Sequence, residues 1–322
     1  MVTVEEVFLS GIQKLNAAEV ENPNLDAKII FKHILSVDNE QFELFKKNEI
    51  SSKITKSYFE LIDRRIKREP IAYITNKQSF WNDEFKVTKD TLIPRPETEL
   101  ILESVISYFP DKKIDLNIAD LGTGSGCIII SLLQEYINAS GIGIDISKEA
   151  IKIANENKKL LKNNERLKLL EEDYAEYNLN GFDIIVSNPP YISQNSLDIQ
   201  KDVYDYEPHL ALFSKNNGID AYNKIQRNEI LEQYSNFSFQ HLDLCDYSKS
   251  KKFFENFDPN FNERVIACPM SGLQVACTHI ISSGMRVRCE NSNLVSRVLK
   301  PGAEMKQQNT GTICQKKQLL RI

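Results

Sequence analysis

Strand-like and helix-like segments alternate along the central part of this 322-residue chain, and the alternation limits the possible folds more than any other feature. Short apolar runs typical of buried strands are separated by longer segments whose apolar residues recur at helical spacing. The strand-like runs are residues 117–120, 141–145, 167–170 and 182–186, and the helical segments are residues 96–109, 126–136 and 148–161. Such alternation predicts a parallel, doubly wound α/β sheet.

A different pattern covers residues 1–70 and indicates a small helical domain. From position 4 to about position 69 the apolar residues recur at helical spacing, so we expect several short helices, the last of which ends at Pro70. The charged run at residues 64–68 is most simply a solvated helix face, although a surface for docking a partner is an alternative.

The rest of the chain divides into three parts. Residues 71–92 are expected to form a β-hairpin connector, and residues 93–225 the sheet domain. The strand-like pieces of the connector are residues 71–74, 80–81 and 85–87. Residues 226–322 lack the alternation, and within them only residues 237–257 read as a strand, an acidic turn and a helix.

Charge and cysteine usage exclude several classes of function. The formal net charge is −5 and the pI is near 5.6, whereas a protein that coats nucleic acid normally carries a basic surplus. No stretch approaches the ~18 apolar residues of a membrane span, and the N-terminus lacks the pattern of a signal peptide, so we expect a cytoplasmic protein. The six cysteines include no C-x-x-C pair, which predicts reduced thiols and neither a metal site nor a redox pair.

A glycine-rich turn joins the first predicted strand to the helix that follows it. Its members are Gly122, Thr123, Gly124, Ser125 and Gly126. Three glycines in five residues let the backbone pass very close to a ligand. The spacing is G-x-G-x-G, not the G-x-G-x-x-G of dinucleotide binders, and the G-K-[ST] ending of a phosphate-binding loop is missing. The turn therefore favours an S-adenosylmethionine site, with a purely structural turn as the alternative.

Further polar residues close the next two strands at the same edge of the predicted sheet. Asp145 lies 25 residues after Asp120, near the ~20-residue offset at which a carboxylate reaches a pair of ribose hydroxyls. Asp173 and Tyr174 follow the third strand, and we expect them to contact the adenine of the cofactor. The alternative for this pair is an ordinary polar loop.

The tetrapeptide Asn188-Pro189-Pro190-Tyr191 follows the fourth predicted strand and is the candidate catalytic motif. Proline has no N–H, so the carbonyl groups of Asn188 and Pro189 are expected to stay free as acceptors, and the asparagine amide adds another. Tyr191 offers a flat face for stacking. Such a corner can hold a planar NH2 group with its nitrogen aimed at a cofactor above the strand ends.

Together these motifs resemble those of the release factor glutamine methyltransferases, over roughly residues 1–225. The stretches that carry the resemblance are the glycine turn, Asp145, the Asn-Pro-Pro-Tyr motif, and residues 68–74, 94–99, 206–208, 211–213 and 218. The Asn-Pro-Pro-Tyr motif alone is shared with nucleic-acid methyltransferases that act on exocyclic amines, whereas P-R-P-E-T-E at residues 94–99 is more selective. A sister family that modifies a ribosomal protein has a similar layout.

The resemblance implies a class I S-adenosylmethionine-dependent methyltransferase, with a Rossmann-like doubly wound sheet and a helical N-terminal domain that recognises the substrate. The implied substrate is the glutamine of the Gly-Gly-Gln tip of a peptide chain release factor. Orientation then supplies much of the rate, because an amide nitrogen is a poor nucleophile and alignment of reactants can contribute ~7–11 kcal/mol. No general base is evident, and the four histidines belong to no recognisable constellation.

Two alternatives remain open on the sequence. One is the same chemistry on a nucleic-acid adenine or cytosine, which requires a flipped base. The other is an inactive protein that binds cofactor or partner, because residues 226–322 depart from the family pattern. That segment reads as a fusion or a frameshifted tail, in which case the sheet is expected to lack its last strands.

Overall fold

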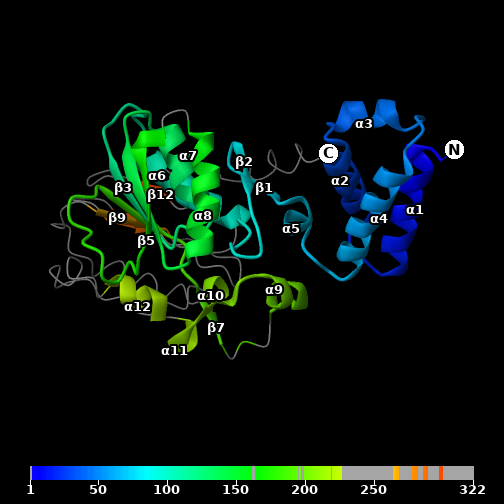
Figure 1. Cartoon of the computed structure of the whole chain (residues 1–322). Helices are drawn as coiled ribbons and strands as arrows, with labels where there is room; N and C mark the ends of the chain where they lie inside the picture. Colours follow the sequence, from blue (N-terminus) through cyan, green and yellow to red (C-terminus); the bar gives the residue numbers. More distant parts are fainter. Residues whose placement is uncertain are drawn as a thin grey trace.

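The computed structural model describes residues 2–161, 164–194, 196, 199–218, 220–226, 264–267, 278–281, 286–288 and 297–299. Figure 1 shows the N-terminal helices, in blue, standing apart from the green sheet domain, with a short helix and a hairpin between them. In the described part of the chain, no helix has the length and apolar character needed to cross a membrane.

Four helices build the N-terminal domain around a small aromatic core. They are α1 (Val4–Ala17), α2 (Pro23–Leu35), α3 (Asn39–Phe45) and α4 (Ser52–Ile66). Thr3 and Asp38 start α1 and α3 with capping boxes, in which each side chain accepts from a backbone N–H of the first turn. Phe31 and Tyr58 are fully buried with ring centroids 4.3 Å apart, so aromatic packing joins α2 to α4.

The charged run at the end of α4 is a solvated face only in part, because Lys67 and Arg68 are exposed whereas Arg65 is largely buried. Arg65 donates to the buried Asp26 at 2.6 Å, and only 15% of its side chain is exposed. Arg64 pairs with Glu69, and Arg68 donates to the carbonyl oxygen of Ala18 at 3.0 Å. Guanidinium groups have several donors on a long apolar stem, so they can fasten a helix end to neighbouring loops while the stem packs.

The connector contains one element that the hairpin prediction missed. Residues 71–74 belong to a short helix, α5 (Ile71–Thr75), because the carbonyl of Pro70 accepts from the amides of its first turn and Asn76 ends it in the left-handed conformation. The hairpin itself is confirmed: β1 (Lys77–Phe80) pairs antiparallel with β2 (Asp83–Lys86).

A six-stranded sheet with order β10-β9-β6-β3-β4-β5 forms the second domain. Its strands are β3 (Asn117–Leu121), β4 (Ser140–Asp145), β5 (Leu167–Glu171), β6 (Ile184–Ser187), β9 (Arg264–Ala267) and β10 (Thr278–Ile281). All neighbours pair in parallel except β9 and β10. The chain moves outward from β3 to β5 and returns to β6 on the other side of β3, which confirms the predicted doubly wound sheet. A reversal of this kind opens a crevice at the carboxyl ends of the strands.

Three longer helices pack on this sheet, and shorter elements connect the helices and strands. The longer helices are α6 (Glu99–Tyr108), α7 (Cys127–Glu135) and α8 (Lys148–Asn157). The shorter elements are η1 (Pro96–Thr98), η2 (Lys158–Leu160), η3 (Asn164–Arg166), β7 (Ile192–Ser193), α9 (Lys201–Tyr206), α10 (His209–Leu212), β8 (Phe213–Ser214), α11 (Lys215–Gly218) and α12 (Asp220–Gln226).

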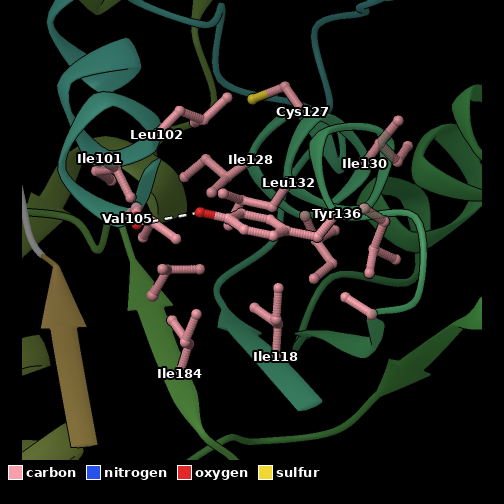
Figure 2. Packing of buried hydrophobic residues seen from close by; sticks show 14 of the residues in the cluster. Ile101, Leu102, Val105, Ile118, Cys127, Ile128, Ile130, Leu132, Tyr136 and Ile184 are labelled. Carbon is pink, nitrogen blue, oxygen red and sulfur yellow. Dashed lines mark hydrogen bonds between the residues drawn. The ribbon is translucent and has the colours of Figure 1, made fainter. Parts of the chain in front are cut away.

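Buried side chains cover both faces of the sheet. Ile118 and Ile184 pack against α6 and α7, and the adjacent Ala119 and Ile185 belong to a separate cluster on the other face. Figure 2 shows the first cluster, in which the hydroxyl of the fully buried Tyr136 donates to the carbonyl of Val105 at 3.1 Å. Successive strand residues therefore face opposite sides, and both sides are apolar, as a covered parallel sheet requires.

Strands after residue 225 extend the sheet, so the expectation that its last strands are missing was wrong for the described residues. β9 pairs in parallel with β6, and β10 pairs antiparallel with β9 at the edge. Two further strands, β11 (Arg286–Arg288) and β12 (Arg297–Leu299), form a separate antiparallel pair. The strand, turn and helix predicted for residues 237–257 lie outside the described residues.

Candidate active site

A cavity of about 850 Å³ lies at the carboxyl ends of β3, β4 and β6. It contains most of the residues that the sequence singled out. The candidate residues that line it are Gly122, Thr123, Gly124, Ser125, Asp145, Asp173, Tyr174, Asn188 and Pro190. Segments that lie far apart along the chain therefore meet at the crevice expected for a doubly wound sheet.

The glycine turn presents its backbone to this cavity. Gly122, Gly124 and Gly126 have φ values of 71°, 57° and 80°, in the left-handed region that favours glycine. A Cβ atom built on Gly122 or Gly124 has no neighbour within 4 Å, whereas one on Gly126 would lie 3.1 Å from Cδ1 of Ile130. The first two glycines thus leave room on the cavity side, and Gly126 lets the helix pack closely.

Asp145 anchors the middle of the turn from the end of β4. Its Oδ2 accepts from the backbone N–H of Gly124 at 2.8 Å, and its Oδ1 accepts from that of Ser147 at 2.9 Å. Burial raises the pKa of this carboxyl, and the backbone hydrogen bonds oppose the rise. Each carboxylate oxygen has a second lone pair, so the group can still accept from a ligand hydroxyl.

Asp120 is a buried carboxyl next to the glycine turn. Its sequence position indicated only the end of a strand. Asp120 is fully buried, and its Oδ2 accepts from the hydroxyl of Thr123 at 2.7 Å. Burial raises the pKa of Asp120 to about 7, while the Thr123 hydrogen bond lowers it and the nearby Asp145 raises it further. The acidic end of β3 and the G-x-G-x-G spacing are the signals that could have pointed to this pair.

Asn188 lies at the end of β6 with its side chain half-buried. Its Nδ2 donates to the hydroxyl oxygen of Thr98 at 3.2 Å, and Thr98 is buried and lines the same cavity. This contact leaves Oδ1 of Asn188 as an acceptor. Thr98 was missed as a site residue, although it belongs to the P-R-P-E-T-E stretch on which the resemblance partly rests.

The other members of the Asn-Pro-Pro-Tyr motif differ in where they lie. Pro190 lines the cavity, whereas Pro189 is buried and, like Gly126, is not among the lining residues. Tyr191 also does not line the cavity and packs, partly buried, against the apolar cluster that includes Leu121 and Ile185. Within this motif the cavity is therefore lined by Asn188 and Pro190.

An ion pair fixes the segment before η1, and Leu92 and Pro94 of this segment line the cavity. The carboxylate of Glu207, whose side chain is 1% exposed, accepts from Arg95 and, at 3.2 Å, from the backbone N–H of Ile93. Beside it, Tyr206 donates to the carbonyl of Lys67 at 2.7 Å, which links α9 to the end of α4. The buried carboxylate of Glu207 thus fixes the loop before η1. The neighbouring residue, Tyr206, contacts the helical domain.

Three aromatic rings line the outer part of the cavity. Tyr204 and His209 have ring centroids 4.8 Å apart, and His209 lies edge-on to Phe213 at 5.2 Å. A ring nitrogen of His209 lies 2.9 Å from the carbonyl oxygen of Tyr204. The histidine is thus engaged in packing α9 against α10 and lies in no catalytic constellation of the described residues.

Metal-ligand clusters are absent from the described residues: no group of three or more His, Cys, Asp or Glu side chains there could hold an ion. Cys127 is free and buried, and burial raises the pKa of its thiol to about 12. The other five cysteines lie outside the described residues. The polar groups that line the cavity include backbone groups, carboxylates and the Asn188 amide.

Two family models match the chain. The PrmC N-terminal domain matches residues 6–75, and the methyltransferase small domain matches residues 98–205. The first model covers nearly all of the four helices and α5, and the second runs from the start of α6 almost to the end of α9. The methyltransferase model, the strand order and the crevice agree with the class I S-adenosylmethionine-dependent methyltransferase fold expected from the sequence.

Curated relatives match about 70% of the chain. A release factor glutamine methyltransferase of Koribacter versatilis is 34% identical over 225 residues, 70% of this chain and 80% of that protein. One of Caulobacter vibrioides is 33% identical, with 70% and 78% covered. A bifunctional methyltransferase of Rickettsia typhi is 36% identical, but the match covers 70% of this chain and 47% of the relative. The chain therefore spans about half the length of such bifunctional relatives.

Proposed function

Because the chain belongs to the release factor glutamine methyltransferase family, we propose that it transfers a methyl group from S-adenosylmethionine to the side-chain amide nitrogen of a release-factor glutamine. The glutamine is that of the Gly-Gly-Gln tip, as the sequence resemblance implies. A substrate of the translation machinery places this reaction in the cytoplasm.

The cofactor is proposed to lie along the glycine turn and across the ends of β4 and β5. Gly122 and Gly124 leave space for close approach of the ligand, and Asp145 can accept from ribose hydroxyls with its remaining lone pairs. Asp173 and Tyr174 line the cavity next to β5, where the adenine would follow. S-adenosylmethionine supplies a methyl group activated by its sulfonium charge.

Asn188 is proposed to hold the substrate amide. The observation that carries this role is its position: the side chain shares a cavity with the glycine turn, and its NH2 group is already used by Thr98. Oδ1 can then accept from the NH2 group of glutamine and direct the nitrogen toward the methyl carbon. When bound, S-adenosylmethionine would supply the methyl group to this nitrogen, and S-adenosylhomocysteine and the surplus amide proton would be released.

Substitution of Asn188 tests this proposal. Asn188→Ala is expected to lower methyl transfer to purified release factor by at least about a hundredfold, because the positioning acceptor is lost. The affinity for S-adenosylhomocysteine, measured by calorimetry, is expected to stay within about threefold. Asn138→Ala is the control, since Asn138 donates only to the carbonyl of Lys113 away from the cavity. Transfer by Asn188→Ala at the wild-type rate would contradict the role of Asn188.

Single-stranded DNA and RNA are offered in the same assay, because the Asn-Pro-Pro-Tyr motif is compatible with exocyclic amines. The charge of the cavity favours the protein substrate, since the acidic lining residues outnumber the lysines. The acidic residues are Asp90, Asp145, Glu149, Asp173 and Asp220, and the lysines are Lys89, Lys215 and Lys224. A nucleic-acid phosphate backbone requires the opposite balance. Cofactor binding without turnover on any substrate would instead indicate an inactive binding protein.

A further inference from the structure

We infer that Thr98 is a positioning residue that holds the side chain of Asn188 in the place from which its amide can reach the NH2 group of the substrate. The inference rests on the proposed function, because it concerns the acceptor that would hold the substrate nitrogen. Thr98 belongs to the P-R-P-E-T-E stretch, so the inference gives this stretch a role in positioning the substrate.

The first argument is the hydrogen bond itself. Nδ2 of Asn188 lies 3.2 Å from Oγ1 of Thr98, and both residues line the cavity. Thr98 is 3% exposed, so water competes little for this contact. An asparagine amide has one acceptor end and one donor end. With the donor end directed to Thr98, the acceptor end is left for the ligand.

The second argument is that the Thr98 hydroxyl has no task in the local helix. Thr98 occupies the N-cap position of α6, where threonine often accepts from a backbone N–H of the first turn. Here its side chain makes no such capping bond, and its backbone is already helical. The hydroxyl is therefore used for a contact with a residue 90 positions away.

The third argument is that hydrogen bonds and an ion pair fix the backbone around Thr98. Its backbone N–H donates to the carbonyl of Arg95 at 3.0 Å, and Arg95 pairs with the buried Glu207. The same carboxylate accepts from the backbone of Ile93. A threonine on a loop fixed in this way can hold the Asn188 side chain in one position, which a freely moving side chain could not do.

Loss of the hydroxyl has a specific consequence. Without it, the Asn188 side chain loses its buried hydrogen-bond partner and can move from the position in which Oδ1 faces the substrate. The substrate nitrogen is then no longer held in line with the methyl group. Cofactor binding is proposed to depend on the glycine turn and Asp145, so loss of the Thr98 hydroxyl should leave the cofactor affinity unchanged.

Methyl-transfer kinetics on release factor test the inference. Thr98→Val keeps the shape and removes the hydroxyl, and we expect kcat to fall roughly ten- to a hundredfold, as for loss of one hydrogen bond to a buried polar group. Thr98→Ser should retain kcat within about threefold. Ser104→Ala is the matched control, because Ser104 is a buried hydroxyl of the same helix that bonds only to the carbonyl of Leu100. The affinity for S-adenosylhomocysteine should remain unchanged in all three variants.

A second measurement tests the hydrogen bond without any substrate. The side-chain NH2 resonances of Asn188, identified by their absence in Asn188→Asp, should exchange with solvent at least about tenfold faster in Thr98→Val than in the wild type or in Thr98→Ser.

Unchanged kcat and exchange in Thr98→Val would overturn the inference, as would a parallel loss of cofactor affinity. A wild-type chain that does not methylate release factor would refute the proposed function, and the exchange measurement would still decide the role of Thr98.

Discussion

The backbone N–H of Gly124 donates to Oδ2 of Asp145 at 2.8 Å, so the carboxylate that ends β4 holds the glycine turn that follows β3. The turn is also fixed from the strand side, because the N–H groups of Gly122 and Thr123 both donate to the carbonyl of Ile144. The turn is therefore fixed by hydrogen bonds from β4, and substitutions on its cavity side should affect cofactor binding more than folding.

Gly124→Ala should weaken cofactor binding by about tenfold or more. The new methyl group points into open space on the cavity side, where the cofactor is proposed to lie, and the left-handed φ of 57° adds roughly 1–2 kcal/mol of strain. Gly181→Ala is the matched control, with φ of 86°, equally open space and a position away from the cavity. Calorimetry with S-adenosylhomocysteine measures the loss of affinity, and thermal unfolding of both variants measures the backbone strain. Equal losses of affinity in the two variants would contradict the prediction.

Asp145→Asn should lower the affinity for S-adenosylhomocysteine roughly ten- to a hundredfold. An asparagine has one acceptor oxygen, so it cannot accept from both Gly124 and Ser147 and also reach a ribose hydroxyl. The control is Asp183→Asn, since Asp183 accepts from the backbone N–H of Asn117 at the amino ends of the strands. Affinity titrations should find the control unchanged, and wild-type affinity in Asp145→Asn would exclude the ribose role.

Stability should depend on pH through Asp120. Its pKa is raised from 3.8 to about 7 in the folded state, so the folded chain binds more protons than the unfolded chain between these values. The contribution of this group to stability is therefore greatest below about pH 4, falls as pH rises, and is constant above about pH 7.5, with a total change on the order of 4 kcal/mol.

Asp120→Asn removes this titration and leaves the other groups in place. Its free energy of unfolding minus that of the wild type should increase between about pH 5 and about pH 8 in urea titrations. The same difference at both pH values would show that Asp120 titrates normally. The sign of the change with pH is the informative quantity, because the amide also alters the contact with Thr123.

Breaking the ion pair of Arg95 and Glu207 should destabilise the wall of the cavity. Arg95→Met leaves a carboxylate that is 1% exposed without its cation, at a cost of roughly 2–4 kcal/mol, below that of a fully buried pair because the Arg95 side chain is 31% exposed. Glu207→Gln in the same chain should recover part of the loss. Lys77→Met, which breaks the exposed pair with Glu84, should cost less than about 1 kcal/mol. Equal losses in urea unfolding would contradict this account.

The sequence was sufficient for features that depend on local geometry. Left-handed turns require glycine, strand and helix periods are visible in the apolar pattern, and carboxyl ends of parallel strands share one edge. For this reason the doubly wound sheet could be predicted, and Asp145 and Asn188 could be expected near the glycine turn before the structure was known.

What only the tertiary structure decided are the contacts between distant segments. Thr98 meets Asn188 across 90 residues, Arg95 meets Glu207 across 112, and Arg65 near the end of α4 pairs with the buried Asp26 of α2. Residues 71–74 became a helix, and β9 and β10 extended the sheet. No local pattern encodes such pairs, because a side chain's partner is determined by how the helices and strands pack, and that packing depends on the whole chain.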